Sequence, residues 1–325
     1  MLCRVTDRML SLNDTMKDMC DALRGNFTIF NLGCVGDADF VLPRHLLKTL
    51  TVVEVDAEAG AATSARYHQK ISIQQPIAPE QGRRVFRRNN FVGTCSLLDP
   101  LDGVVEAFGM ENYCAVVDRV ELECDTIPNV LRAHQIKSLD FLKTDIEGSD
   151  NEIIRSCGEF LGRTHLIQCE LRFRPFYKTE PYFQDTVNLL AEHGYEVLDI
   201  THIDRWRYNT PHRQFQVQGR AAWADFLFVL KPERLAETFG DNLAEAVAKQ
   251  VILACMLGKK NYGEFLLQKF KTSLPETWFG ELDHLTKPCF PGIRPFLTSL
   301  RRTCFPVELF LKHQIGKSQF VALRR

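Results

Sequence analysis

Short apolar runs alternate with helix-like patterns along residues 26–231, and this alternation dominates the chain. Runs of about four to eight apolar residues predict strands, whereas apolar residues spaced three and four apart predict amphipathic helices. The predicted strands are residues 27–33, 50–56, 70–78, 139–145, 164–171, 195–202 and 224–230, with a further β-rich segment at 113–124. The predicted helices are residues 7–24, a short helix opened by Pro43, residues 126–135, a helix after Ser149 that Gly162 ends, and residues 181–195.

The order of these elements predicts an α/β fold. Strands that alternate with helices form a parallel sheet that is covered by helices on both faces. No helix separates the last two predicted strands, so one of them must return antiparallel at the edge of the sheet. We therefore expect a Rossmann-like fold with a seven-stranded, mostly parallel sheet and an antiparallel edge strand. Residues 79–112 are predicted to form a long, turn-rich excursion from it.

The pattern divides the chain into three parts. Residues 1–25 form an N-terminal helix, residues 26–231 the α/β domain, and residues 232–325 a helical C-terminal appendage. From residue 285 onward the appendage is rich in lysine and arginine, with Glu308 as its single acid. Such a segment is typically a solvated surface, and it would also suit peripheral contact with an anionic surface such as lipid.

Composition narrows the class of protein. The chain has 325 residues, 45% of them hydrophobic, and a formal net charge of −1, which gives no support for a general nucleic-acid binder. None of its 11 cysteines is part of a C-x-x-C pair, so no zinc site is expected. There is no secretory signal and no apolar run of the ~18 residues that a membrane span requires. We therefore expect a cytoplasmic protein with reduced thiols.

Glycines and acids follow the first two predicted strands, at the place where doubly wound sheets bind their ligands. Gly33 and Gly36 form a G-x-x-G turn after Asn31, and a glycine there lets the backbone approach a ligand closely. Glu54 and Asp56 end the second strand, where an acid typically binds ribose hydroxyls. These residues favour an adenosine-containing ligand, either NAD or S-adenosylmethionine; an ordinary turn and solvated acids are the alternative.

Three further acids end central strands. Strand alternation places Lys143 and Asp145 on one side of the strand in "FLKTDIEGSD", with Glu147 just beyond, and Glu170 ends the next strand. Crowded carboxylates raise a pKa, which suits a general base, or they hold a cation. The alternative is that the acids cap the following helix and pair with Lys143.

A capping box would make that alternative unnecessary. Ser149 and Glu152 have the spacing of such a box, in which the two side chains satisfy the first turn of a helix. Because this box is available, we expect Asp145 and Glu147 to face a cleft instead.

The segment "SLDFLKTDIEGSDNEIIRSC", residues 138–157, resembles the signature of the FkbM-type methyltransferases, in which an apolar strand runs into a K-x-D-x-E-G motif before a helix. Other pieces resemble this family in the same order: residues 54–59, 77–86, 94–100, 120–131, 167–172 and 223–229. The resemblance covers about residues 26–231. It implies the methyltransferase form of the Rossmann fold and transfer of a methyl group from S-adenosylmethionine, usually to a hydroxyl of a sugar or other small metabolite.

The resemblance also implies roles for single residues. Gly33 would hold the methionine end of the cofactor, Glu54 the ribose and Ala78 the adenine, and Ser96 lies in the family's serine-leucine segment. Asp145, the expected base, would lie beside the sulfonium and the acceptor.

Other acids would assist that base. Glu147 would be an orienting or cation-holding partner, and Glu170 would lie nearby. A magnesium ion is compatible with these acids but is not predicted.

The first loop departs from the family. Asn31 stands where an aspartate is common, and Asp37 stands at a usual glycine unless the alignment slides to Gly36. A non-catalytic Rossmann module that has lost the cofactor and recruits a partner through its helical tail is therefore a second hypothesis.

The connection at residues 203–223 has the composition of an acceptor lid. Arg205, Arg207 and His212 would grip phosphates or carboxylates, and Trp206 would stack on a sugar. Such a lid suits a phosphorylated or nucleotide-linked sugar. The alternative is a solvated loop whose aromatic residues pack on the sheet edge.

Two other functions rank lower. An RNA methyltransferase would need the basic tail and this loop to form one stripe beside the cleft. An NAD dehydrogenase ranks last, because its glycine fingerprint is missing and His165 and His202 are expected to be structural.

Overall fold

The structure is a computed structural model that describes residues 17–33, 40, 42–57, 64–212 and 219–287. Its main sheet has seven strands: β1 (Phe27–Leu32), β2 (Leu50–Asp56), β3 (Gln69–Gln74), β6 (Phe141–Thr144), β7 (Leu166–Arg172), β8 (Tyr195–Trp206) and β9 (Arg220–Leu230). The α-helices are α2 (Arg44–Leu47), α3 (Asp102–Phe108), α4 (Glu111–Cys114), α5 (Ile127–Ala133), α6 (Asp150–Ser156), α7 (Phe183–Glu192), α8 (Pro232–Phe239), α9 (Leu243–Met256), α10 (Lys260–Lys269) and α11 (Glu276–Thr286). Residues 17–23 are also helical, whereas the rest of the predicted N-terminal helix lies outside the described residues.

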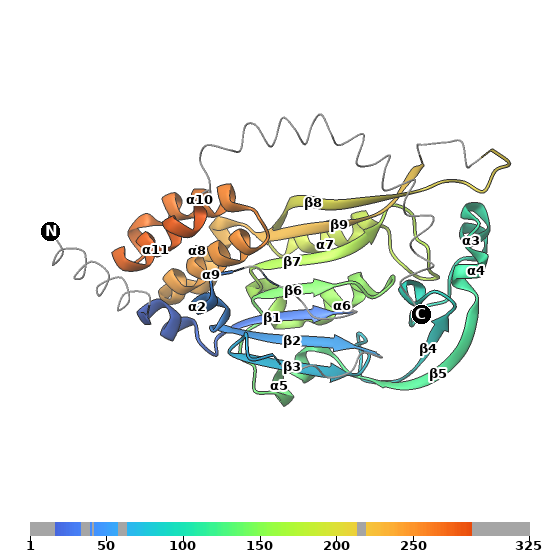
Figure 1. The fold of residues 1–325 in the computed structure, drawn as a ribbon, viewed down its shortest axis with the longest axis horizontal. Coiled ribbons are helices and arrows are strands. Elements are labelled where there is room, and N and C mark those ends of the chain that lie inside the picture. The colour runs from blue at the N-terminus through green and yellow to red at the C-terminus, as the bar shows by residue number, and fades with distance from the viewer. Residues whose placement is uncertain (1–16, 34–39, 41, 58–63, 213–218, 288–325) are drawn as a thin grey trace. The chain divides into compact units, whose positions relative to one another are not determined.

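The strand order in the main sheet is β3-β2-β1-β6-β7-β9-β8 (Figure 1). The first five strands run parallel, and β9 runs antiparallel to both of its neighbours. The predicted α/β class and the seven-stranded, mostly parallel sheet are therefore confirmed. The reversed strand lies one position in from the edge, because β8 pairs with its outer side.

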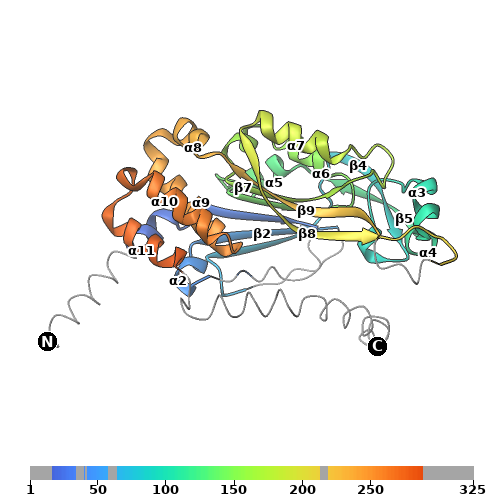
Figure 2. The same cartoon turned by 90° about the horizontal axis from the view of Figure 1, so that it is seen from above.

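The apolar pattern of the strands explains how the layers pack. Every residue of β1 is buried, as expected of a central parallel strand covered on both faces. Phe226 of β9 stacks on Phe183 of α7 with ring centroids 6.0 Å apart, so even-numbered residues of β9 face α7. Figure 2 shows α5, α6 and α7 on one side of the sheet.

A two-stranded sheet lies outside the main one. It consists of β4 (Gly82–Asn89) and β5 (Val116–Cys124), which pair antiparallel. The sequence predicts only turns where β4 lies, because "GRRVFRRN" lacks apolar alternation. A second small core is built from α3, α4 and the loop after β7: Val104, Val105, Phe108, Cys114, Phe176 and Tyr177.

The helices after Lys231 share the main core. Residues 246–255 of α9 are all buried, and Leu235 of α8 packs in the same cluster as the strands. Figures 1 and 2 show α8 to α11 gathered at the amino ends of the parallel strands. The compact unit that contains the sheet accordingly runs to Leu285. The rest of the basic tail, residues 288–325, lies outside the described residues.

Three local predictions are wrong. Ser149 stands at the N-cap of α6 but makes no capping hydrogen bond through its side chain, so no capping box forms. The helix ends at Ser156, before Gly158 rather than at Gly162, because a 3-10 segment follows. The connection between the last strands is shorter than predicted, since β8 continues to Trp206.

No helix among the described residues is long and apolar enough to cross a membrane. The described cysteines are free thiols, and all of them except Cys95 are buried.

Candidate active site

A cavity of about 170 Å³ lies where β1, β2 and β6 end. Gly33 follows β1, Asp56 closes β2, and Asp145 follows β6, so three strand ends contribute to the wall. Residues 75–77 after β3 and Ser96 of the inserted segment complete it. The carboxyl ends of parallel strands are the usual ligand site of doubly wound sheets.

Gly33 permits a close approach of two backbones. It has a φ of +78°, and a Cβ atom on it would lie only 1.9 Å from the carbonyl oxygen of Asp145. Its N–H donates to the carbonyl of Val55 at 3.0 Å. Next to it, Asn31 is buried, and its Oδ1 has no hydrogen-bond partner among the described residues. Gly36 lies outside the described residues.

The acids of β2 occupy different environments. Asp56 lines the cavity, whereas Glu54 is buried and pairs with Lys70 of β3 at 2.9 Å. Glu54 shares a face of β2 with Asp56, but it lies two residues back from the strand end and does not line the cavity. Asp56 is thus better placed than Glu54 to meet a ligand in the cavity. Ala78 is fully buried, and residues 75–77 line the cavity in its stead.

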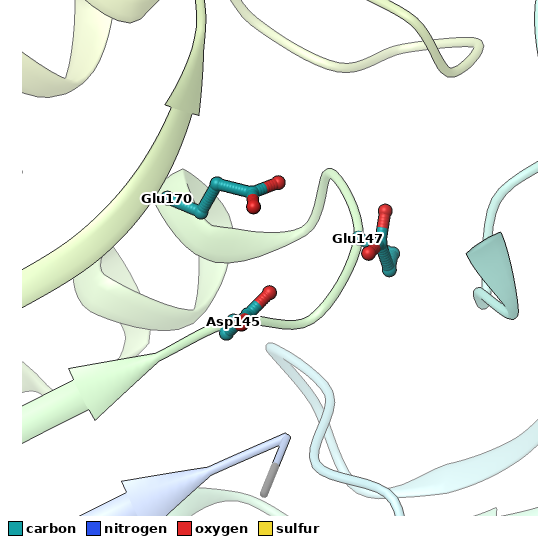
Figure 3. Close-up of side chains that lie close together, drawn as sticks. All are labelled: Asp145, Glu147 and Glu170. Atoms are coloured by element: carbon teal, nitrogen blue, oxygen red, sulfur yellow. The ribbon is translucent and has the colours of Figure 1, made fainter. Parts of the chain in front are cut away.

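The three acids predicted to converge do so. Carboxylate oxygens of Asp145, Glu147 and Glu170 all lie within 4.8 Å of one another. Figure 3 shows that Asp145 and Glu147 come from the end of β6 and the following turn, and that Glu170 comes from β7. The register of the parallel strands β6 and β7 explains the meeting, because Thr144 pairs with Cys169, and Asp145 and Glu170 are the residues that follow them.

A buried arginine holds these acids together. The Arg172 guanidinium donates to Glu147, to Glu170 at 2.7 Å and to Glu180 at 3.3 Å. The Tyr177 hydroxyl also donates to Glu147, at 2.7 Å. A divalent cation would therefore have to compete with a guanidinium that already bridges Glu147 and Glu170.

The sequence pattern offered one clue to this arginine. Arg172 stands two residues after Glu170 on β7, so alternation places both side chains on the same side of the sheet. Tyr177 belongs to the loop after β7, and no pattern in the sequence indicated its place in the site.

Burial changes the protonation of the cluster. Loss of water raises the pKa of Glu147 to about 7 and that of Glu170 to about 9, although Arg172 acts against both shifts. Asp150 at the start of α6 is buried as well, and burial raises its pKa to about 7. Both glutamates therefore take up a proton more readily than an exposed glutamate does.

The turn after β6 is strained. Glu147 has a φ of +56°, which is uncommon for a residue with a side chain. Gly148 follows with a φ of +98°, and the Ser96 hydroxyl donates to the Glu147 carbonyl at 2.7 Å. Strained non-glycine residues cluster at functional sites, where surrounding contacts maintain them.

The predicted lid uses its aromatic residues for packing. Trp206 meets Phe108 and Phe176 edge-on, with centroids 5.4 and 5.1 Å apart, and Tyr208 stacks on Phe108 at 4.9 Å. Arg205 donates to the carbonyl of Gly219 at 3.2 Å. The two aromatic rings thus pack on residues of the second small core rather than on the sheet edge.

Other predicted residues differ in exposure. His212 is exposed, and Arg207 and Lys143 are partly buried.

Residues 39–197 match the family model of the methyltransferase FkbM domain. No curated protein and no solved structure matches the chain. The matched span contains Asp56, Ser96 and the three clustered acids, whereas Gly33 precedes it.

Proposed function

Because the chain belongs to the FkbM methyltransferase family, we propose that it transfers a methyl group from S-adenosylmethionine to a hydroxyl of a sugar, a nucleotide sugar or a related small metabolite. One observation carries this proposal: the cavity at the ends of β1, β2 and β6 is walled on one side by Asp145 and Glu147. One cleft thus offers a place for the methyl donor and carboxylates that can accept a proton from a hydroxyl.

The residues around the cavity suit this cofactor. Gly33 lines the cavity where the methionine end would lie, Asp56 is placed to bind the ribose, and Pro76 and Ile77 offer an apolar wall for the adenine. When bound, the cofactor supplies a methyl group on a positively charged sulfur. The carboxylate of Glu147 favours a cation at this place.

The protein's part in the reaction is alignment and removal of a proton. Methyl transfer is an in-line displacement, so most of the catalysis comes from positioning the two reactants. We assign proton acceptance from the acceptor hydroxyl to Asp145, which lines the cavity at the end of β6. Arg172 and Tyr177 bind Glu147. The Glu147 carboxylate therefore orients the acceptor and sets the charge of the site, and it does not accept the proton.

A binding and turnover experiment tests this assignment. Mass spectrometry of the purified protein should detect copurified cofactor, and a screen of sugars and nucleotide sugars should give a methylated product. Asp145→Asn should reduce kcat by about 10²- to 10⁴-fold while cofactor affinity stays within severalfold. Asp241→Asn on the exposed surface before α9 is the matched control. Turnover in Asp145→Asn equal to that of the control would rule out Asp145 as the base.

A further inference from the structure

One face of the main sheet turns from apolar to polar along its strands. This is the face opposite α7, which carries the odd-numbered residues of β9. Near the amino ends its residues are buried and apolar: Ile29, Phe141, Leu166 and Val229. Two residues further along the parallel strands, the same face carries Asn31, Lys143 and Gln168, whereas β9 places the buried Leu227 beside Gln168. A polar face that continues from the clustered acids is not explained by core packing.

The next row of this face brings three strands together. Glu170 of β7 is the register partner of Asp225 on β9, and Asp225 is the partner of His202 on the edge strand β8. Register partners project to the same face of a sheet. Asp225 therefore extends the acid cluster toward the sheet edge, beyond the cofactor cavity.

Two rings lie beside this aspartate. Trp223 precedes Asp225 by two residues on β9, so it lies on the same face. Its ring lies 5.1 Å from that of His202, centroid to centroid, at an angle of 43°. Trp223 is partly exposed and His202 is exposed. A partly exposed tryptophan next to carboxylates is a suitable platform for a sugar ring, because the ring's C–H face packs on the indole while its hydroxyls bind the acids.

Two carboxylates, Asp145 and Asp225, lie near the platform, and the neighbouring cations are Lys143 and His202. Burial raises the pKa of Asp225, and the nearby Asp145 raises it further, whereas Lys143 and His202 lower it. The Arg172 guanidinium, also on this face, is committed to Glu147, Glu170 and Glu180. A carboxylate or phosphate placed here would meet acids of the same sign, whereas an ammonium group would be attracted.

We propose that Trp223, His202 and Asp225 form the acceptor subsite, and that this subsite selects an amino sugar over an anionic sugar. This inference rests on the proposed methyl transfer and specifies that its acceptor is positively charged. Any phosphate of a nucleotide-linked acceptor has to lie away from these residues.

Saturation-transfer NMR on the full chain without cofactor tests the subsite. The probes are glucosamine, glucose and glucuronic acid at neutral pH. Glucosamine should bind at least about tenfold more tightly than glucuronic acid, as expected for about 1.4 kcal/mol of charge preference, with glucose between them. Trp223→Ala should abolish the signal, and Trp223→Phe should largely restore it because the aromatic face remains.

Two further variants sharpen the test. Asp225→Asn should bring glucosamine and glucuronic acid to within about threefold of each other, since it removes one of the charges that discriminate between them. Trp278→Phe, on α11, should leave all three affinities unchanged. Equal binding of glucuronic acid and glucosamine in the unmodified protein, or unchanged binding in Trp223→Ala, would overturn the proposal.

Cofactor binding separates this proposal from the one it rests on. Trp223→Ala should bind S-adenosylmethionine as the unmodified protein does. A protein that binds the cofactor but no sugar contradicts the subsite and leaves methyl transfer standing. A protein that binds glucosamine through Trp223 but never the cofactor supports the subsite and contradicts methyl transfer.

Discussion

Arg172 sets the chemistry of the acid cluster at the level of a single residue. Its guanidinium is almost fully buried and meets three glutamates. A buried charge is tolerated only where it is paired and hydrogen-bonded, so arginine and acids depend on each other. The consequence is that Glu147 stays fixed beside the cavity with a pKa close to physiological pH.

Glu147 should make cofactor affinity depend on pH. Burial raises its pKa from 4.5 to about 7, so the carboxylate is neutral below that pH and charged above it. A charged carboxylate in the cavity wall attracts the sulfonium by on the order of 0.7 kcal/mol, so the affinity for S-adenosylmethionine should rise about threefold between pH 6 and pH 8. Calorimetry in the unmodified protein and in Glu147→Gln checks this. An equally steep pH dependence in Glu147→Gln would show that another group is responsible.

Cofactor binding should require the absence of a side chain at Gly33. Gly33→Ala places a Cβ 1.9 Å from a backbone oxygen, so the ends of β1 and β6 must move apart and cofactor binding should be lost. Gly158→Ala is the matched control, because Gly158 also has a positive φ, +57°, but a Cβ there meets nothing within 4 Å. The control should lose only about 1–2 kcal/mol of stability, the usual cost of the left-handed conformation. Cofactor affinity that is equal in the two variants would contradict this account.

The residues predictable from the sequence are those that end apolar strands. Asp145, Glu147 and Glu170 were found because strand ends of parallel sheets meet at one edge. Tyr177 and Trp223 could not be found in this way. Tyr177 lies in a loop. Trp223 is brought to the site only by the pairing of β7, β9 and β8, which the spacing of residues in the sequence does not reveal.

At the scale of elements, apolar periodicity predicted the parallel strands and missed two features of the antiparallel ones. β4 is rich in arginine, so its sequence shows no apolar alternation. β8 runs on to Trp206 through three register shifts against β9, and bulges break the two-residue period on which strand prediction depends. Such bulges also make an exposed edge strand a poor template for pairing with another chain.

The attachment of α9 to the sheet depends on Lys249. Its ammonium group is buried and donates to the carbonyl of Asn26, to Asp140 at 3.1 Å and to Glu245 at 3.2 Å. Asp140 in turn accepts from the N–H of Thr28 at 2.7 Å. These bonds connect the helix to the starts of β1 and β6.

Lys249→Met should therefore destabilise the protein by about 3–5 kcal/mol, because it leaves the carboxylate of Asp140 buried without its cation. Lys269→Met is the control, since its pair with Glu233 is exposed and should contribute little to stability. Urea unfolding of both variants gives the comparison. Similar losses in the two variants would mean that the buried pair does not hold α9 in place.

At the scale of the whole molecule, the helices after Lys231 complete the core of the sheet. Leu235, Val251 and Leu266 are fully buried in that core, so their loss would expose a large apolar surface. The change of pattern at residue 231 in the sequence marks a change of element type, and it does not mark the end of the compact unit.

Truncation makes this distinction measurable. A chain ending at Lys287 should unfold cooperatively with a Tm close to that of the full chain, because the unit that contains the sheet runs to Leu285. A chain ending at Lys231 should aggregate or fail to fold, because it lacks α8 to α11. A soluble chain ending at Lys231 with a cooperative transition would instead show that residues 26–231 fold alone.

The central claim is that this fold binds S-adenosylmethionine at the ends of β1, β2 and β6. Isothermal titration calorimetry of the full chain with this cofactor tests it most directly. The account predicts binding of one molecule per chain with a Kd in the range of about 1 μM to 1 mM that is typical of enzyme substrates, and loss of that binding in Gly33→Ala. A folded protein that gives no binding heat with millimolar cofactor, at pH 6 and at pH 8, would contradict it.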